Sequence, residues 1–181
     1  MMKIALDAMG GDHAPDVVVE GAISAVSSND GTFGVVLTGP KDIITALLSK
    51  HEYPRDLIEI VDAPDIVSMD EAPASVLKTK SNSGLVRSVS LQKEGYVQAS
   101  VSAGNSGAMM AACLMLLGRI GGVARPAITC LLPGMNEKVV LLDCGANVDE
   151  KAQHLLDWAI CGSVYACLLY TSDAADDGLS V

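Results

Sequence analysis

The sequence predicts an α/β fold, a three-layer α/β/α sandwich in which a mostly parallel β-sheet lies between two layers of helices. Short apolar runs that suit strands alternate along the chain with stretches whose apolar residues recur at helical spacing. Half of the 181 residues are hydrophobic but only 3% are aromatic, so the core is aliphatic. Parallel strands that are covered on both faces have this composition.

The first part of the chain contains three predicted strands and two predicted helices. Strands are expected at 3–8, 34–38 and 57–62, and helices at 15–28 and 41–50. Val18, Ala22 and Val26 lie along one stripe of the first helix. Pro15 suits its first turn, because a helix start does not need the N–H group that proline lacks. An irregular stretch follows at 63–73.

The middle of the chain continues the alternation and then changes to a hairpin. We expect a helix at 74–93 that is interrupted at 81–84, a strand at 97–102 and a helix at 108–117. This last segment is apolar all round and too short to span a bilayer, which predicts a fully buried central helix. Strands at 127–132 and 138–143 are expected to form a hairpin, followed by a polar loop at 143–149 and a further helix.

Charge and cysteine content exclude several classes of function. The formal net charge is −10, which argues against a nucleic acid as the main partner. The N-terminus leads directly into a strand, so we expect no signal peptide. The five cysteines are odd in number and lack C-x-x-C spacing, so they predict neither a disulfide framework nor a metal site. A reduced, cytoplasmic setting is expected.

Two glycine turns follow predicted strands. Gly10 and Gly11 come after the first strand, and Gly104 and Gly107 come after the strand at 97–102. Glycine lets a backbone turn sharply and approach a ligand closely, and the N–H groups at a helix start attract anions. Because the carboxyl ends of parallel strands meet at one edge of a sheet, both turns are expected to line one ligand cleft.

Three long motifs resemble the bacterial phosphate acyltransferases, which convert acyl carrier protein thioesters and phosphate into acyl phosphate. They are ALDAMGGDHAP at 5–15, SAGNSGA at 102–108 and LDCGANVD at 142–149, and GSVYA at 162–166 also matches. The resemblance implies a fold like those of isopropylmalate dehydrogenases and phosphotransacetylases, with no cofactor and no metal. It makes 1–166 the N-terminal part of an acyltransferase domain whose second half is absent, so the fold is truncated.

The resemblance also implies which residues serve the reaction. Phosphate or acyl phosphate would be bound by residues of the two glycine turns, namely Gly10, Gly11, Gly104, Asn105, Ser106 and Gly107. Ser106 stands where the family usually has threonine, which keeps the hydroxyl. A plain helix cap remains the alternative for Asn105 and Ser106.

The catalytic candidates are His13, Asp7, Asn105 and Asp143. His13 would protonate the leaving thiolate, since its ordinary pKa is about 6.5, or it is a loop histidine satisfied by backbone. Asp7 and Asp143 would orient a donor, act as a base, or cap the loops that follow them.

An acidic carrier protein would need a local basic patch to dock on this acidic chain. Lys78, Lys80 and Arg87 are the candidates, followed by Arg119 and Arg125, and the alternative is ordinary solvated charge. Cys144, where the family usually has valine, is not expected to act as a nucleophile because nothing nearby lowers its pKa.

The resemblance implies a homodimer at the cytoplasmic face of a membrane. It would pass acyl phosphate to a membrane glycerol-3-phosphate acyltransferase, in the first step of phosphatidic acid and phospholipid synthesis. Two other functions remain open, a nucleotide-dependent oxidoreductase and a non-catalytic fragment. Against the oxidoreductase, the chain lacks the G-x-G-x-x-G motif of nucleotide-binding proteins after its first predicted strand. Residues 167–181 resemble the translation of a sequencing adapter, so we expect a non-native tail there.

Overall fold

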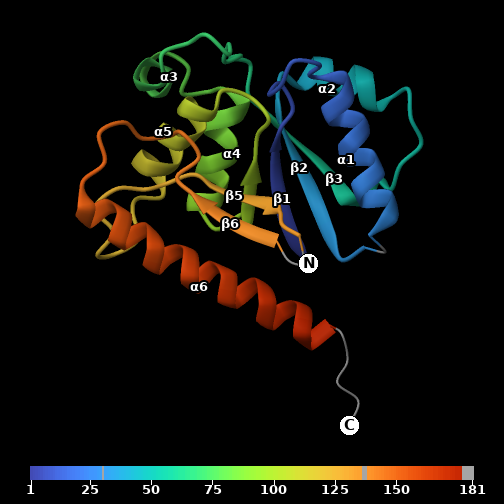
Figure 1. Cartoon of the computed structure of the whole chain (residues 1–181). Helices are drawn as coiled ribbons and strands as arrows, with labels where there is room; N and C mark the ends of the chain where they lie inside the picture. The colour runs from blue at the N-terminus through green and yellow to red at the C-terminus, as the bar shows by residue number, and fades with distance from the viewer. Residues whose placement is uncertain (30, 136–137, 177–181) are drawn as a thin grey trace. The chain divides into compact units, whose positions relative to one another are not determined.

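A computed structural model of the chain describes residues 1–29, 31–135 and 138–176. The chain divides into two compact units, Met1–Gly118 and Arg119–Val181, and each is described by itself. The first unit contains a four-stranded parallel sheet in the order β3-β2-β1-β4 (Figure 1). Its strands are β1 (Met2–Asp7), β2 (Phe33–Gly39), β3 (Ile58–Asp62) and β4 (Ala99–Val101).

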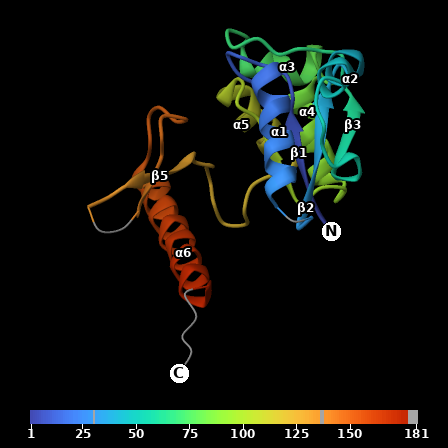
Figure 2. The same cartoon turned by 90° about the vertical axis from the view of Figure 1, so that its right-hand side faces the viewer.

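Helices cover both faces of this sheet, as predicted. On one face lie α1 (Asp16–Ser28) and α2 (Lys41–Leu48), and on the other lies α4 (Gly84–Lys93), as Figures 1 and 2 show. Side chains of a strand point alternately to opposite faces. Val35 and Leu37 therefore pack into the cluster that contains α1 and α2, whereas Val36 packs with Leu91 on the side of α4. This arrangement confirms the three-layer fold class.

The register of the parallel strands fixes what meets at their carboxyl ends. Leu6 lies opposite Leu37 on one side of β1 and opposite Val101 on the other. The next residue along, Asp7, lies opposite Thr38. The side chains that follow the strands therefore gather at one edge of the sheet, where the two glycine turns are also found.

Helix α5 (Ser106–Leu116) is less buried than its composition predicts. It packs against α4 and against α3 (Pro73–Thr79), which follows the turn η1 (Arg55–Leu57) and β3. Ala108 and Ala112 are fully buried, but Met115 is 70% exposed. The prediction of a fully buried central helix is wrong for the described residues, because α3 and α4 cover only one side of an apolar cylinder.

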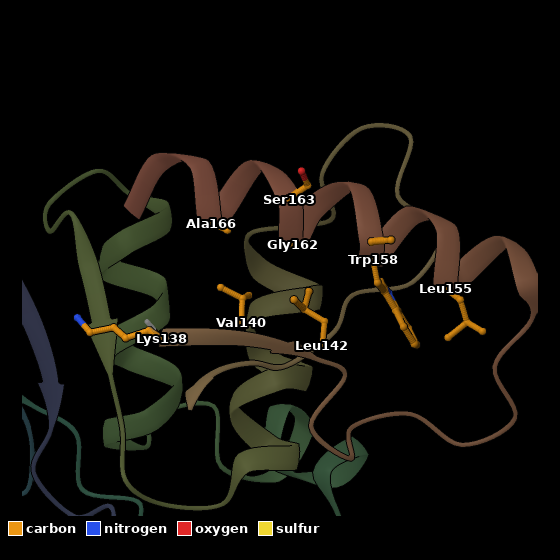
Figure 3. A pocket seen from close by; sticks show the side chains of 9 residues that line it. Lys138, Val140, Leu142, Leu155, Trp158, Gly162, Ser163 and Ala166 are labelled. Carbon is orange, nitrogen blue, oxygen red and sulfur yellow. The ribbon is translucent and has the colours of Figure 1, made fainter. Parts of the chain in front are cut away.

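The second unit is built from an antiparallel hairpin and one long helix. Strands β5 (Thr129–Pro133) and β6 (Lys138–Leu142) pair as predicted, and α6 (Ala152–Asp176) lies along one face of the hairpin. Figure 3 shows Val140 and Leu142 facing α6 around a cavity of about 450 Å³. The ring of Trp158 is buried there, and its Nε1 donates to the Arg125 carbonyl at 2.7 Å. Asn136 and Glu137, in the predicted hairpin loop, lie outside the described residues.

The predicted boundary at residue 167 falls inside α6, which continues to Asp176. Residues 177–181 lie outside the described part of the chain. A non-native origin of 167–181 stays a prediction. Among the described residues, no helix combines the length and the apolar character that crossing a membrane requires.

Candidate functional site

Asp7 stands at the centre of the candidate site, at the carboxyl edge of the four-stranded sheet. Its carboxylate is buried, and it accepts hydrogen bonds from Ser102 Oγ at 2.8 Å and from the Met9 amide at 3.2 Å. Burial raises the pKa of Asp7 above its ordinary value, because these two hydrogen bonds offset the loss of hydration only in part. The carboxylate of Asp7 therefore forms its hydrogen bonds with protein groups rather than with solvent.

The two glycine turns lie at the same edge of the sheet, as predicted, and they contact each other there; a shared ligand cleft stays a prediction. A Cβ atom on Gly10 would come within 2.8 Å of the Gly104 amide nitrogen and 2.7 Å of Ser102 Oγ. A Cβ atom on Gly104 would lie 3.1 Å from the Gly10 Cα. Only residues without a side chain allow this approach. Gly11 has a φ of +119°, so the first turn also depends on glycine for its backbone conformation.

Ser102 links the two turns through its hydroxyl group. Its Oγ donates to Asp7 and accepts a hydrogen bond from the Gly104 amide at 3.1 Å. The carboxylate at the end of β1 therefore holds the turn that follows β4. We did not identify Ser102 from the sequence. The available signal was its place as the first residue of the SAGNSGA motif, and the observed register, in which Leu6 lies opposite Val101, makes the next residues Asp7 and Ser102 neighbours.

The first residue of α4, Gly84, packs against Asp7 and Thr38 at the edge of the site. A Cβ atom on Gly84 would lie 2.4 Å from Asp7 Oδ1 and 2.6 Å from the Thr38 carbonyl oxygen. Thr38 Oγ1 donates to the Gly84 carbonyl at 2.8 Å, and Ser83 caps the helix by accepting from the Val86 amide. The contacts of Gly84 with Asp7 and Thr38 join distant parts of the sequence, so no local sequence pattern could have revealed them.

The Asn105 side chain caps helix α5 and also binds the loop that precedes α3. Its Oδ1 accepts from the Ala108 amide at 2.9 Å. Its Nδ2 donates to the carbonyls of Ser68, Met69 and Glu71 at 3.0–3.2 Å. The side chain is buried, and each of its polar atoms has a protein partner. Of the two roles left open by the sequence, the structure shows the cap, and direct contact of Asn105 with a ligand stays a prediction.

Other predicted residues of the turns are accessible. Ser106, the first residue of α5, and His13, in the first turn, are both exposed. Gly107 is exposed as well, although a Cβ atom there would lie 2.6 Å from Pro73 Cγ. Exposed polar side chains beside backbone amides are what an anion site requires.

The three predicted docking cations differ in their surroundings. Lys80 forms an ion pair with Glu71, which lowers the pKa of that carboxyl. This pair braces the irregular loop that Asn105 also holds. Lys78 is exposed on α3, and Arg87 is half-buried on α4. Lys78 is therefore the cation that is best placed for a partner, and docking by any of the three stays a prediction.

Asp143 belongs to the second unit, where it organises the loop after β6. Its Oδ1 accepts from the Ile128 amide at 2.7 Å, and its Oδ2 accepts from the Asn147 amide at 2.8 Å and from Asn147 Nδ2 at 3.1 Å. Desolvation raises the pKa of Asp143, but these hydrogen bonds outweigh it, and the pKa lies below its ordinary value. The observed role is loop capping, and a catalytic role stays a prediction.

Cys144 has the surroundings of an inactive thiol. A hydrogen bond with Cys130 is the main cause that raises the pKa of the Cys144 thiol, and desolvation adds to it. A thiol with a raised pKa is a poor nucleophile at neutral pH. This agrees with the expectation from the sequence.

Comparisons with known proteins agree with the three motifs. The chain is 41% identical over 179 residues to a phosphate acyltransferase of Clostridium botulinum, covering 98% of this chain and 53% of that protein. It is 44% identical over 178 residues to a phosphate acyltransferase of Salinibacter ruber, with the same coverage. The chain therefore spans about half the length of the curated relatives it matches.

A solved structure shares the fold. A phosphotransacetylase from Streptococcus pyogenes superposes with a TM-score of 0.65 at 19% sequence identity, over 88% of this chain and 51% of that one. At this identity the likeness supports the fold alone, and it agrees with the predicted phosphotransacetylase-like architecture. Residues 2–179 match the family described as fatty acid synthesis protein, and the chain belongs to that family.

Proposed function

We propose that this chain forms the phosphate-binding edge of an enzyme that transfers an acyl group from acyl carrier protein to inorganic phosphate. The contact between the turns at Gly10 and Gly104 carries this proposal. It brings two segments of bare backbone to one edge of the sheet, beside the start of α5. The name of the matched relatives, phosphate acyltransferase, supports phosphate as the anion.

The geometry suits a reaction in which phosphate is the nucleophile. The amides of Ser106 and Gly107, the first two of α5, lack intrahelical acceptors, whereas Asn105 caps the Ala108 amide; these two amides and the exposed Ser106 hydroxyl can donate to phosphate oxygens. One phosphate oxygen attacks the thioester carbonyl carbon, and the carbon–sulfur bond breaks as the acyl–oxygen bond forms. The thiolate leaves with the electron pair and takes a proton. His13 is exposed beside the turn and is our candidate for that proton donor.

Asp7 acts as a positioning residue in this account. A free carboxylate beside the phosphate would repel it. Asp7 is instead buried and occupied by Ser102, which in turn holds the Gly104 amide. Its contribution is to fix the two turns at the separation that one anion needs.

Several features are carried over from the family resemblance alone. Acyl carrier protein as donor would use Lys78, with Arg87 and Lys80 nearby. Asp143, the homodimer, the cytoplasmic location and transfer to a membrane glycerol-3-phosphate acyltransferase are predictions of the same kind. The alternative of a nucleotide-dependent oxidoreductase is not favoured by the relatives' names.

Trapping of the product tests the proposal. Residues 1–166 are joined in frame to the second half of the Clostridium botulinum relative, and the fusion is incubated with acyl carrier protein thioester and phosphate. Hydroxylamine converts acyl phosphate to a hydroxamate, and a reaction without phosphate corrects for direct attack on the thioester. We expect phosphate-dependent hydroxamate. A fusion that unfolds cooperatively but gives none would refute the proposed function.

A further inference from the structure

Two of the five cysteines are neighbours in the second unit. Cys130 belongs to β5, and Cys144 lies in the loop after β6. The Cys144 amide donates to the Ile128 carbonyl at 3.1 Å, so Cys144 lies opposite Ile128. Cys130 comes two residues after Ile128, and side chains two residues apart along a strand point to the same face. The backbone pairing therefore brings the two thiols to one face of the hairpin.

The contacts of the Cys144 thiol agree with this placement. Its Sγ donates to the Leu141 carbonyl, with 3.6 Å between sulfur and oxygen, and Leu141 is the residue that pairs with Cys130 in the hairpin. The same thiol forms a hydrogen bond with Cys130, which is the main cause of its raised pKa. Both sulfur atoms are reduced in the structure, and they are in direct contact.

The pair lies on the face of the hairpin that points away from α6. Thr129 and Leu142 pair with each other and line a cavity with α6, and Figure 3 shows Leu142 facing that helix. Successive side chains of a strand alternate between faces, so Cys130 and Leu141 point the other way. Leu141 is 43% exposed, and Cys130 and Cys144 are both half-buried. A molecule as small as hydrogen peroxide can therefore reach the two sulfur atoms.

We propose that Cys130 and Cys144 form an oxidation site, at which a peroxide converts the two thiols into an intramolecular disulfide that fastens the loop after β6 to β5. The Cys130 thiolate attacks one peroxide oxygen, the O–O bond breaks, and the hydroxide that leaves takes up a proton as water. The Cys144 sulfur then attacks the Cys130 sulfenic acid. The S–S bond forms, the S–O bond breaks, and a second water leaves with the Cys144 proton. Two thiols and one peroxide give one disulfide and two waters.

The environment of the pair assigns the two roles. Cys130 is the attacking sulfur, because the hydrogen bonds of Cys144 hold the proton of that thiol. A sulfenic acid condenses with a neighbouring thiol, so Cys144 needs no activation for the second step. This role is compatible with the poor reactivity that Cys144 would have toward a thioester.

The disulfide would act on the loop that Asp143 organises. An S–S bond is about 2.05 Å long, which is shorter than any contact between two thiols, so oxidation draws Cys144 toward β5. Cys144 directly follows Asp143, whose carboxylate accepts from the amides of Ile128 and Asn147. A covalent link at this point restrains the start of the loop at residues 143–149. We expect amide exchange there to slow at least about fivefold after oxidation.

Peroxide treatment followed by peptide mass spectrometry tests the proposal. The chain at low concentration is treated with hydrogen peroxide, remaining thiols are blocked with iodoacetamide, and trypsin is added. Cleavage after Lys138 separates the two cysteines, so the disulfide is detected as two joined peptides. We expect Cys130 and Cys144 to lose their thiols together, at least about tenfold faster than Cys161 of α6. The same treatment in concentrated urea should remove this preference.

Variants assign the order of the steps. With Cys144→Ser, Cys130 has no thiol partner and should accumulate as a sulfenic acid that dimedone traps. Cys161→Ser is the matched control, and it should form the disulfide as the wild-type chain does.

Four results would overturn the proposal. They are the absence of joined peptides from the wild-type chain, joined peptides that come only from covalent dimers, equal pairing in urea, and unchanged or faster amide exchange at residues 143–149 after oxidation. Acyl transfer is not measured in any of these experiments, so their outcome is independent of the proposed function.

Discussion

Asp7 is a buried carboxylate whose hydrogen bonds connect the segments at the carboxyl edge of the sheet. The carboxylate lies between the start of α4 and the two glycine turns, and Ser102 transmits its position to the Gly104 amide. Burial of a charge costs free energy, and the raised pKa of Asp7 reflects that cost. Perturbed pKa values of this kind are common at the functional sites of proteins.

The pH dependence of stability provides a test for Asp7. Because its pKa is higher in the folded than in the unfolded chain, the wild-type protein loses stability as the pH rises above the ordinary value of 3.8. Asp7→Asn removes this loss. We expect the free energy of unfolding of the variant minus that of wild type to be larger, meaning that the variant is relatively more stable, at about pH 7 than at about pH 4. Urea unfolding measures it, and a pH-independent difference would contradict the burial of a charged group.

Glycine substitutions test the contact between the turns. Gly10→Ala should cost about 1–3 kcal/mol, because the new methyl group meets Ser102, Asp7 and Gly104 at under 3 Å. Gly21→Ala is the matched control within α1, where the methyl group has open space, and it should stabilise the chain by about 0.5–1 kcal/mol. Thermal unfolding compares the two. Equal effects would show that the turns do not approach as closely as described.

Helix α5 and the loop before α3 behave as one structural element through Asn105. A single side chain caps the helix and holds three carbonyls of the loop, while the ion pair of Lys80 with Glu71 braces the same loop. The cap was one of two readings that the sequence allowed. Because Asn105 is buried and all of its polar side-chain atoms have protein partners, its substitution is expected to reduce stability.

Two variants of neighbouring residues separate these roles. Asn105→Ala should cost about 1–2 kcal/mol from the lost cap and should speed amide exchange in residues 65–71. Ser106→Ala, at an exposed position of the same turn, should change stability by under about 0.5 kcal/mol and weaken phosphate binding. Unfolding and hydrogen exchange measure the first effect, and phosphate titration the second. Equal stability loss in both variants would argue against the cap and the loop contacts of Asn105.

Local sequence patterns predicted most helices and strands, whereas the burial of α5 and the contacts within the site depend on residues far apart in the sequence. Strands β1 to β3, the hairpin and the helix break near Gly84 follow from periodicity and turn residues. The burial of α5 could not be predicted, because a uniformly apolar helix carries no signal for which side is covered. The approach of Gly84 to Asp7 depends on tertiary packing between residues far apart in sequence.

At the scale of the whole molecule, the chain spans about half the length of the curated relatives it matches. It carries a net charge of −10, yet its proposed substrates are also anionic. Binding must therefore depend on local groups, namely backbone amides at the turns and cations such as Lys78, rather than on the overall field.

Phosphate titration followed by ¹⁵N NMR distinguishes a single anion site formed by the two glycine turns from separate sites. Chloride at equal ionic strength provides the control. We predict that phosphate shifts the amide signals of Gly10, Gly11, Gly104, Ser106 and Gly107 with one shared dissociation constant. Shifts that are confined to the hairpin and α6, or that follow different constants at the two turns, would contradict the account.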